Sequence, residues 1–302
     1  MSNIRVAVVQ AGTLPFDREA SLAHAERLIA QAAAAGARLV VFPEAFIGGY
    51  PKGADFGARV GSRTPEGRKL FRRYFEGALD VPSPDTARLG EAARLHQTWL
   101  VIGVIERDGG TLYCSVLFFS PDGHLAGKHR KLMPTAMERL IWGFGDGSTL
   151  PVIDTGFGKV GAVICWENYM PLLRAAMYAK GVQLYCAPTV DDRDTWPATM
   201  RHVALEGRCF VLSACQYLAP EGAPPSEHIR GGSMIISPLG RILAGPHYDS
   251  EAVLTADIDL GEIAEGKFDL DVAGHYARPD VLRLSVNEQP AWAAESSNLD
   301  LD

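Results

Sequence analysis

The chain has 302 residues, long enough for one large domain or two ordinary ones, and its 47% hydrophobic and 22% charged residues are typical of a globular protein. A formal net charge of −7 argues against a nucleic-acid partner, which would require a clustered basic face. No apolar run approaches the roughly 20 residues of a membrane span, so we expect no membrane partner, and the first such run is too short for a secretion signal.

Apolar periodicity predicts an opening strand, helix and strand at 4–10, 17–35 and 38–42. Further helices are predicted at 65–79, 86–96, 172–180, 196–206 and 259–268. Further strands are predicted at 99–106, 112–120, 125–131, 151–155, 159–164, 183–187, 209–216, 233–237, 241–243 and 252–257. Because helices alternate with strands and no linker separates two halves, we expect a single α/β domain over residues 1–290, followed by a tail at 291–302.

The five cysteines are an odd count, with neither a CxxC pair nor Cys/His metal spacing. They therefore predict no disulfide framework and no metal site, and they favour a reducing compartment, so we expect a cytoplasmic protein. No GxGxxG or GxxxxGK[ST] segment supports nucleotide binding.

Three reactive side chains fall at or near predicted strand ends. Glu44 follows the strand 38–42 in a Pro/Gly-rich loop, and Lys131 ends the strand 125–131. Cys165 directly follows the strand 159–164, before a helical segment that starts near residue 169. Open α/β sheets place their chemistry at such strand ends, and a helix N-terminus favours thiolate over thiol. A cysteine on a buried strand is more often structural, however, so Cys165 alone is weak support for catalysis.

Together these groups suit attack on a carbon that is multiply bonded to nitrogen or oxygen. A cysteine supplies the nucleophile, a carboxylate takes its proton and later activates water, and a fixed ammonium stabilises developing negative charge. Histidine is the usual base for cysteine, so a pair of Cys165 with His129, His202 or His275 competes with this interpretation. Composition does not decide between them.

Three segments resemble the signature segments of the nitrilase superfamily, in the expected order: Phe42-Pro43-Glu44, the stretch from His129 to Thr135, and the stretch from Cys165 to Pro171. The stretches 137–143, 186–189, 204–214 and 274–280 are similar to true nitrilases, the branch that includes plant nitrilases and bacterial relatives, more than to amidases or carbamoylases.

The resemblance implies a four-layer α-β-β-α sandwich that assembles into a homodimer or a larger homo-oligomer. It implies Cys165 as nucleophile, Glu44 as general base, Lys131 as electrostatic group and proton donor, and Glu138 as a supporting carboxylate, with no cofactor and no metal. The backbone N–H of Trp166 is the expected oxyanion donor. We expect the substrate pocket to be formed by six side chains: Trp166, Trp142, Tyr50, Thr189, Trp196 and His129.

The implied reaction is hydrolysis of a small-molecule nitrile to a carboxylic acid and ammonia, through a thioimidate and a thioester on cysteine. Arylaceto-, arylpropio- and aliphatic nitriles and β-cyanoalanine are the candidate substrates. An amidase or N-carbamoyl hydrolase with the same residues is the alternative, and a non-enzymatic thiol sensor or scaffold protein is a remote one.

Overall fold

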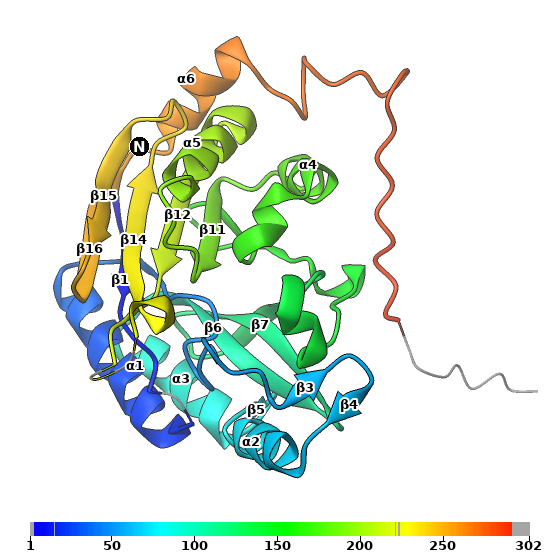
Figure 1. Ribbon diagram of the computed structural model, residues 1–302. Coiled ribbons are helices and arrows are strands. Elements are labelled where there is room, and N and C mark those ends of the chain that lie inside the picture. Colours follow the sequence, from blue (N-terminus) through cyan, green and yellow to red (C-terminus); the bar gives the residue numbers. More distant parts are fainter. Residues whose placement is uncertain (1–2, 15, 221, 223, 292–302) are drawn as a thin grey trace, which may run out of the picture.

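Two sheets lie face to face at the centre of the molecule in this computed structural model, which describes residues 3–291 except 15, 221 and 223 (Figure 1). The first sheet has the order β16-β1-β2-β6-β7-β8, with β5 beside β6, and the second has the order β13-β14-β12-β11-β10-β9, with β15 beside β14. The first sheet comprises β1 (Ile4–Gln10), β2 (Leu39–Val41), β5 (Leu79–Asp80), β6 (Trp99–Asp108), β7 (Thr111–Phe119), β8 (Leu125–Arg130) and β16 (Ala252–Ile258). The second comprises β9 (Val152–Asp154), β10 (Lys159–Ala162), β11 (Leu184–Thr189), β12 (Phe210–Cys215), β13 (Tyr217–Leu218), β14 (Ile229–Ile236) and β15 (Ile242–Tyr248).

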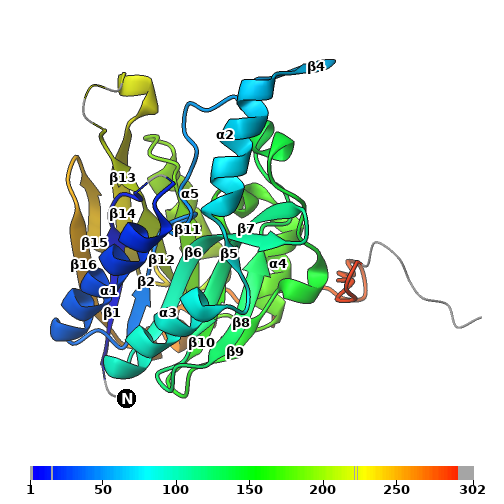
Figure 2. The same ribbon diagram turned by 90° about the horizontal axis from the view of Figure 1, so that it is seen from below.

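Helices cover the outer face of each sheet. The helices are α1 (Arg18–Ala34), α2 (Pro65–Glu76), α3 (Pro84–Leu95), α4 (Pro171–Ala179), α5 (Trp196–Gly207) and α6 (Gly261–Asp269), and the 3₁₀ turns are η1 (Ala136–Leu140), η2 (Gly147–Thr149), η3 (Cys165–Tyr169) and η4 (Pro225–Glu227). Figure 2 shows α1 and α3 side by side outside the first sheet, while α2 extends away beside a small hairpin, β3 (Ala58–Arg59) and β4 (Ser62–Arg63). No helix in the described part of the chain is both long and apolar enough to cross a membrane.

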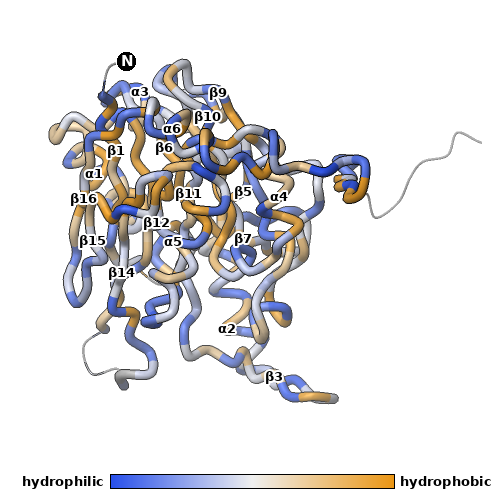
Figure 3. Tube along the Cα trace, turned by 90° about the horizontal axis from the view of Figure 1, so that it is seen from above, coloured by the Kyte–Doolittle hydropathy of each residue, from blue (hydrophilic) through white to orange (hydrophobic). Residues whose placement is uncertain are grey.

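Alternation along the strands produces three packed layers of side chains. On β1, Val6 and Val8 belong to the core between the two sheets, whereas Ala7 and Val9 belong to the core under α1 and α3. On the second sheet, the residues of opposite parity pack under α4 and α5. Hydrophobic residues accordingly gather on the central strands (Figure 3). The expected four-layer α-β-β-α sandwich is thus confirmed.

The predicted elements match the structure except where the sequence is polar or the element is short. Between the predicted strands 209–216 and 233–237, the polar stretch contains β13, η4 and the start of β14. β15 runs on to Tyr248 past Gly245 and Pro246, which end the apolar pattern. The β3–β4 hairpin carries no alternation and was not predicted. Of the expected tail at 291–302, only Ala291 lies within the described residues.

Candidate active site

Cys165 stands at a strained turn between β10 and η3. Its φ is +50°, in the left-handed region that costs a non-glycine residue about 1–3 kcal/mol and that is often found at functional sites. The side chain of Asn168 holds this turn by donating to the carbonyl oxygens of Cys165 at 2.8 Å and Val163 at 3.0 Å. The hydroxyl of Thr189, at the end of β11, donates to Cys165 Sγ at 3.1 Å. The turn therefore fixes the direction of the sulfur.

Glu44 is fully buried in the loop after β2. This loop lies directly against β6, where a Cβ on Gly103 would stand 2.2 Å from the carbonyl oxygen of Pro43 and 2.7 Å from Glu44 Cα. From the second sheet, the Gln216 side chain donates to the Glu44 carbonyl at 2.7 Å. Only a glycine at 103 lets the loop approach β6 this closely, so the position of the carboxylate depends on it.

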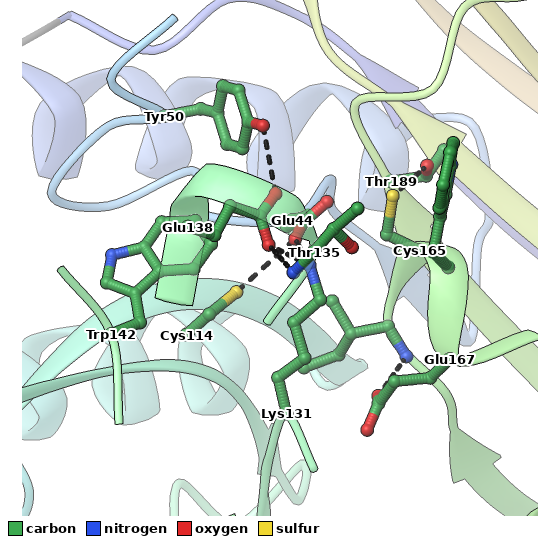
Figure 4. A network of polar contacts seen from close by, with 12 residues as sticks. Glu44, Tyr50, Cys114, Lys131, Thr135, Glu138, Trp142, Cys165, Glu167 and Thr189 are labelled. Carbon is green, nitrogen blue, oxygen red and sulfur yellow. Dashed lines mark hydrogen bonds and ion pairs between the residues drawn. The ribbon is translucent and has the colours of Figure 1, made fainter. Parts of the chain in front are cut away.

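Lys131 joins two carboxylates. Its Nζ lies 2.6 Å from Glu44 Oε1 and 2.8 Å from Glu138 Oε2, and all three side chains are buried (Figure 4). Glu138 in turn accepts hydrogen bonds from the Thr135 backbone N–H at 2.6 Å and from the Tyr50 hydroxyl at 2.9 Å. Side chains from three separate segments are thereby held in one hydrogen-bonded cluster.

Burial sets the protonation of this cluster. It raises the pKa of Glu44 above the ordinary glutamate value, although the charge of Lys131 opposes the shift and that of Glu138 adds to it. Burial also raises the pKa of the Cys165 thiol, again aided by the Glu44 charge. For Lys131, burial is the largest influence and disfavours the cation, but attraction to Glu44 and to the other acidic groups around it together raises the pKa. The resting site therefore holds a thiol beside an ammonium.

One oxygen of Glu44 is available for chemistry. Oε1 contacts Lys131 and also accepts from the Cys114 thiol at 3.5 Å, whereas the buried Oε2 has no hydrogen-bond partner among the described residues. A buried carboxylate oxygen without a partner is costly unless a proton or a substrate completes it. Such an oxygen can accept the proton of a thiol or of a water molecule.

A cavity of about 360 Å³ opens onto Cys165. Glu138 and two of the expected pocket residues, Tyr50 and Trp166, line it, together with apolar groups that include Phe56, Met137, Leu140 and Ile141. The N–H of the Trp166 ring donates to Asp191 at 2.9 Å, and Arg193 stacks on the ring with its guanidinium carbon 4.5 Å from the centroid. The cavity thus leads from the solvent to the thiol along a mainly apolar wall.

The other four expected pocket residues are not among those that line the cavity. Trp142 packs edge-on against Tyr50, and its ring centroid lies 5.5 Å from Lys131 Nζ. Thr189 contacts the sulfur of Cys165. Trp196 is the first residue of α5; its side chain is buried in the core of the second sheet and donates to Ser213 Oγ at 2.9 Å. His129 is buried against Glu167. These residues surround the site without facing the space that a substrate would fill.

The three histidines that compete as bases do not contact Cys165 within the part of the chain that the structure describes. His129 bonds to Glu167 and Thr149, His202 lies 3.5 Å from Glu206 on α5, and His275 packs edge-to-face against Tyr276. A Cys–His pair is therefore not supported. Within the same described residues, no group of three or more His, Cys, Asp or Glu side chains is arranged to hold a metal ion.

Four residues that support the site were not singled out from the sequence: Gly103, Gln216, Glu167 and Asn168. The last two lie inside the segment 165–171, so that segment did carry a signal for them. Gly103 and Gln216 lie far from the reactive residues in sequence, and only the packing of the two sheets brings them to Glu44.

Known proteins resemble this chain over nearly its whole length. The family profile described as Carbon-nitrogen hydrolase matches residues 5–268. An "Aliphatic nitrilase" of Sinorhizobium fredii (strain HH103) is 60% identical over 304 residues, covering 97% of this chain and 98% of the relative. A "Bifunctional nitrilase/nitrile hydratase NIT4B" of Nicotiana tabacum is 59% identical, covering 94% of this chain and 86% of the relative.

Solved structures show the same fold. The crystal structure of Saccharomyces cerevisiae Nit3, described as a member of branch 10 of the nitrilase superfamily, superposes with a TM-score of 0.74 at 25% identity, over 91% of this chain and 96% of that one. The sandwich and the order of its layers therefore persist at low sequence identity.

Proposed function

The chain belongs to the carbon–nitrogen hydrolase family and is a nitrilase, and from this premise we propose how its residues divide the reaction. Cys165 is the nucleophile, Glu44 the general base and Lys131 the electrostatic group that also donates protons. Glu138 holds Lys131 in place, and the backbone N–H of Trp166 is the oxyanion donor. The overall reaction is R–C≡N plus two water molecules giving R–COOH plus ammonia.

The first half of the reaction forms a thioimidate. Glu44 takes the proton of the Cys165 thiol, whose raised pKa keeps it protonated at rest, and the sulfur lone pair adds to the nitrile carbon as one C–N π bond breaks. The proton passes to the nitrogen through Glu44 or Lys131. The ammonium of Lys131 stabilises the negative charge that builds on nitrogen during this addition.

The second half uses water twice. Glu44 takes a proton from the first water as its oxygen adds to the thioimidate carbon, which gives a tetrahedral intermediate. Protonated nitrogen leaves as ammonia, the C=O bond forms, and a thioester remains on Cys165. The second water adds in the same way and releases the acid and the thiol. If the C–S bond breaks before ammonia leaves, the product is an amide.

The contact of Lys131 with both carboxylates, next to a cavity that opens onto Cys165, is the observation that best supports this assignment. A buried ammonium shared by two acids is costly to form, and reactive sites are where such arrangements are found. The Oε2 atom of Glu44, which has no hydrogen-bond partner among the described residues, is free to accept a proton.

Replacement of the nucleophile tests the assignment. Cys165→Ala is expected to abolish ammonia release from nitriles while the circular dichroism spectrum and Tm stay close to the wild type. Cys209→Ala is the matched control, because Cys209 is equally buried but packs beneath α5. Turnover by the Cys165→Ala protein would rule out the proposed nucleophile.

For the substrate we propose nitriles with an apolar group, because the cavity wall is largely apolar and aromatic. Arylaceto-, arylpropio- and aliphatic nitriles fit this wall, and β-cyanoalanine is the polar candidate. The Sinorhizobium fredii relative is named an aliphatic nitrilase, and the tobacco relative is named for both acid and amide formation. A nitrile panel with acid and amide products quantified together tests both points; exclusive turnover of charged nitriles would contradict an apolar substrate.

Assembly and compartment complete the proposal. We infer a homodimer or a larger homo-oligomer, as implied by the superfamily resemblance. The five cysteines are all buried and unpaired, which suits the reducing cytoplasm.

A further inference from the structure

A buried ion pair lies behind the reactive cluster and outside its cavity. His129 Nε2 stands 2.9 Å from Glu167 Oε2, and neither side chain is exposed to solvent. His129 belongs to β8, which delivers Lys131, and Glu167 belongs to η3, which begins at Cys165. Neither residue lines the cavity, so direct contact with substrate does not explain the pair.

The Glu167 carboxylate reaches the backbone on both sides of the site. Its Oε1 accepts the N–H of Leu132 at 2.5 Å, and its Oε2 accepts the N–H of Ile164 at 2.8 Å. Leu132 directly follows Lys131, and Ile164 directly precedes Cys165. One carboxylate therefore joins the chain neighbours of two reactive residues that come from different sheets (Figure 4 shows Glu167 beside both).

The hydrogen bonds of His129 define its charge. Its Nδ1 lies 2.7 Å from the Thr149 carbonyl oxygen, which can only accept, so Nδ1 carries a proton. Its Nε2 faces a carboxylate that already accepts two backbone N–H groups. Burial is the largest influence and opposes the imidazolium, but the charge and hydrogen bond of Glu167, together with the hydrogen bond to Thr149, raise the pKa of His129. The imidazolium thus donates to a carboxylate that also accepts two backbone N–H groups.

We propose that His129 and Glu167 are positioning residues that set the distance between Lys131 and Cys165. This inference rests on the proposed function, since it assumes that Lys131 and Cys165 act on the same substrate carbon and nitrogen. Reactive groups must meet within a few tenths of an ångström, and a displacement of about 1 Å costs on the order of 100-fold in rate. A rigid link between the two backbone segments meets that requirement.

Glu167→Gln tests the link with little change of shape. An amide has one acceptor oxygen, so the side chain can accept from the N–H of Leu132 or of Ile164 but not from both. Its NH₂ group then faces the other backbone N–H, and two donors cannot form a hydrogen bond with each other. We expect kcat per titrated active site to fall about 100-fold, whereas KM changes much less because the cavity wall is untouched.

A second variant separates positioning from stability, because Glu167→Gln also leaves His129 without its anion. In the double variant His129→Gln/Glu167→Gln both partners are neutral, so Tm is expected to rise above that of Glu167→Gln, part of the way to the wild type, while kcat stays low, since the second backbone contact is still missing. Recovery of kcat together with Tm, or a wild-type kcat in either variant, would overturn the proposal.

Glu106→Gln is the matched control. Glu106 is as buried as Glu167, but within the described residues its carboxylate bonds only side chains, those of Ser115, Lys128 and Arg130, and no backbone group next to Lys131 or Cys165. We expect it to lower Tm and to leave kcat near the wild-type value; an equal loss of kcat would show that burial alone explains the effect. Turnover by Cys165→Ala would instead contradict the proposed function, so the two failures are distinguishable.

Discussion

At the scale of single residues, Lys131 brings the Glu138 carboxylate close to the proposed base, Glu44. In a buried site a nearby negative charge raises the pKa of a carboxyl group. The charge of Glu138 contributes to the raised pKa of Glu44. The protonation of the proposed base therefore depends on a neighbour whose side chain contacts Lys131, Thr135 and Tyr50.

Glu138→Gln removes this charge with its shape retained. The amide oxygen can still accept from Lys131 and Thr135, and the NH₂ can donate to the Tyr50 hydroxyl. In the wild type, the raised pKa of Glu44 should put the acidic limb of kcat/KM above pH about 4.5, the ordinary glutamate range. Loss of the Glu138 charge lowers the pKa of Glu44, so the limb should move to lower pH. A pH profile in which the limb stays or moves upward would contradict this coupling.

The sequence identified the reactive residues better than their surroundings. Glu44, Lys131 and Cys165 could be selected because each follows a recognisable apolar strand and lies in a segment that resembles the superfamily. The directions of Trp142, Trp196 and His129 could not be predicted, because they depend on packing partners that are distant in sequence: Tyr74 for Trp142, Ser213 for Trp196 and Glu167 for His129.

At the scale of elements, the loop after β2 and the middle of β6 form one unit. The backbone N–H groups of Phe46 and Ile47 both donate to the Gly103 carbonyl, at 2.9 and 3.1 Å. Glu44 is held two residues before this contact, with Ala45 between them in the left-handed region at φ +51°. A change at position 103 must therefore move the proposed base.

Gly103→Ala should separate the loop from β6, because the added methyl group would lie 2.2 Å from the Pro43 carbonyl oxygen. We expect a loss of about 1–3 kcal/mol in the free energy of unfolding from overpacking. A displaced base should lower kcat by about 10- to 100-fold. Chemical denaturation and steady-state kinetics measure the two effects.

Gly110→Ala is the control, since its Cβ would have no neighbour within 4 Å. It should leave both quantities almost unchanged. Wild-type kinetics in Gly103→Ala would mean that the Glu44 loop tolerates displacement, contrary to the geometry.

Elements with strong apolar periodicity could be predicted with nearly correct bounds, among them β1, α1 and the β6–β7 hairpin. The turn at Cys165 could not, because β10 ends at Ala162 and the 3₁₀ turn starts at Cys165, four residues before the expected helical segment. Its conformation is fixed by Asn168, whose side chain in turn accepts from Tyr185 at 3.0 Å. Local propensity contains no information about such a contact.

At the scale of the whole molecule, the site lies where the two sheets meet. Lys131 follows a strand of the first sheet and Cys165 a strand of the second, so their separation depends on how the sheets pack. The apolar pattern predicted a single α/β domain, and the superfamily resemblance implied this sandwich. Contacts that cross between the sheets, such as Gln216 with Glu44, required the structure.

The His129–Glu167 pair should make stability depend on pH in a defined direction. Because the folded-state pKa of His129 is raised, its contribution is fully present below the unfolded value of about 6.5 and is lost as pH rises through the folded pKa. The Tm advantage of the wild type over His129→Gln/Glu167→Gln should therefore shrink as the pH rises above about 6.5 and through the folded-state pKa. Glu167 and the Thr149 carbonyl are the groups that face the ring. An advantage that grows over this range would contradict a paired imidazolium.

The molar mass in solution tests the proposed homo-oligomer directly. Light scattering should give a mass of at least two chains of 32.6 kDa. A monomeric mass that persists at high protein concentration, with full activity, would contradict it.

Covalent catalysis at Cys165 is the central claim, and mass spectrometry of the enzyme quenched during turnover tests it most directly. We predict an acyl or imidoyl adduct of the nitrile on the peptide that contains Cys165, and unmodified thiols at the other four cysteines, which are buried away from the cavity. Glu44→Gln should slow both formation and release of this adduct. An adduct on another residue, or turnover with no adduct at Cys165 under conditions that trap it, would contradict the account.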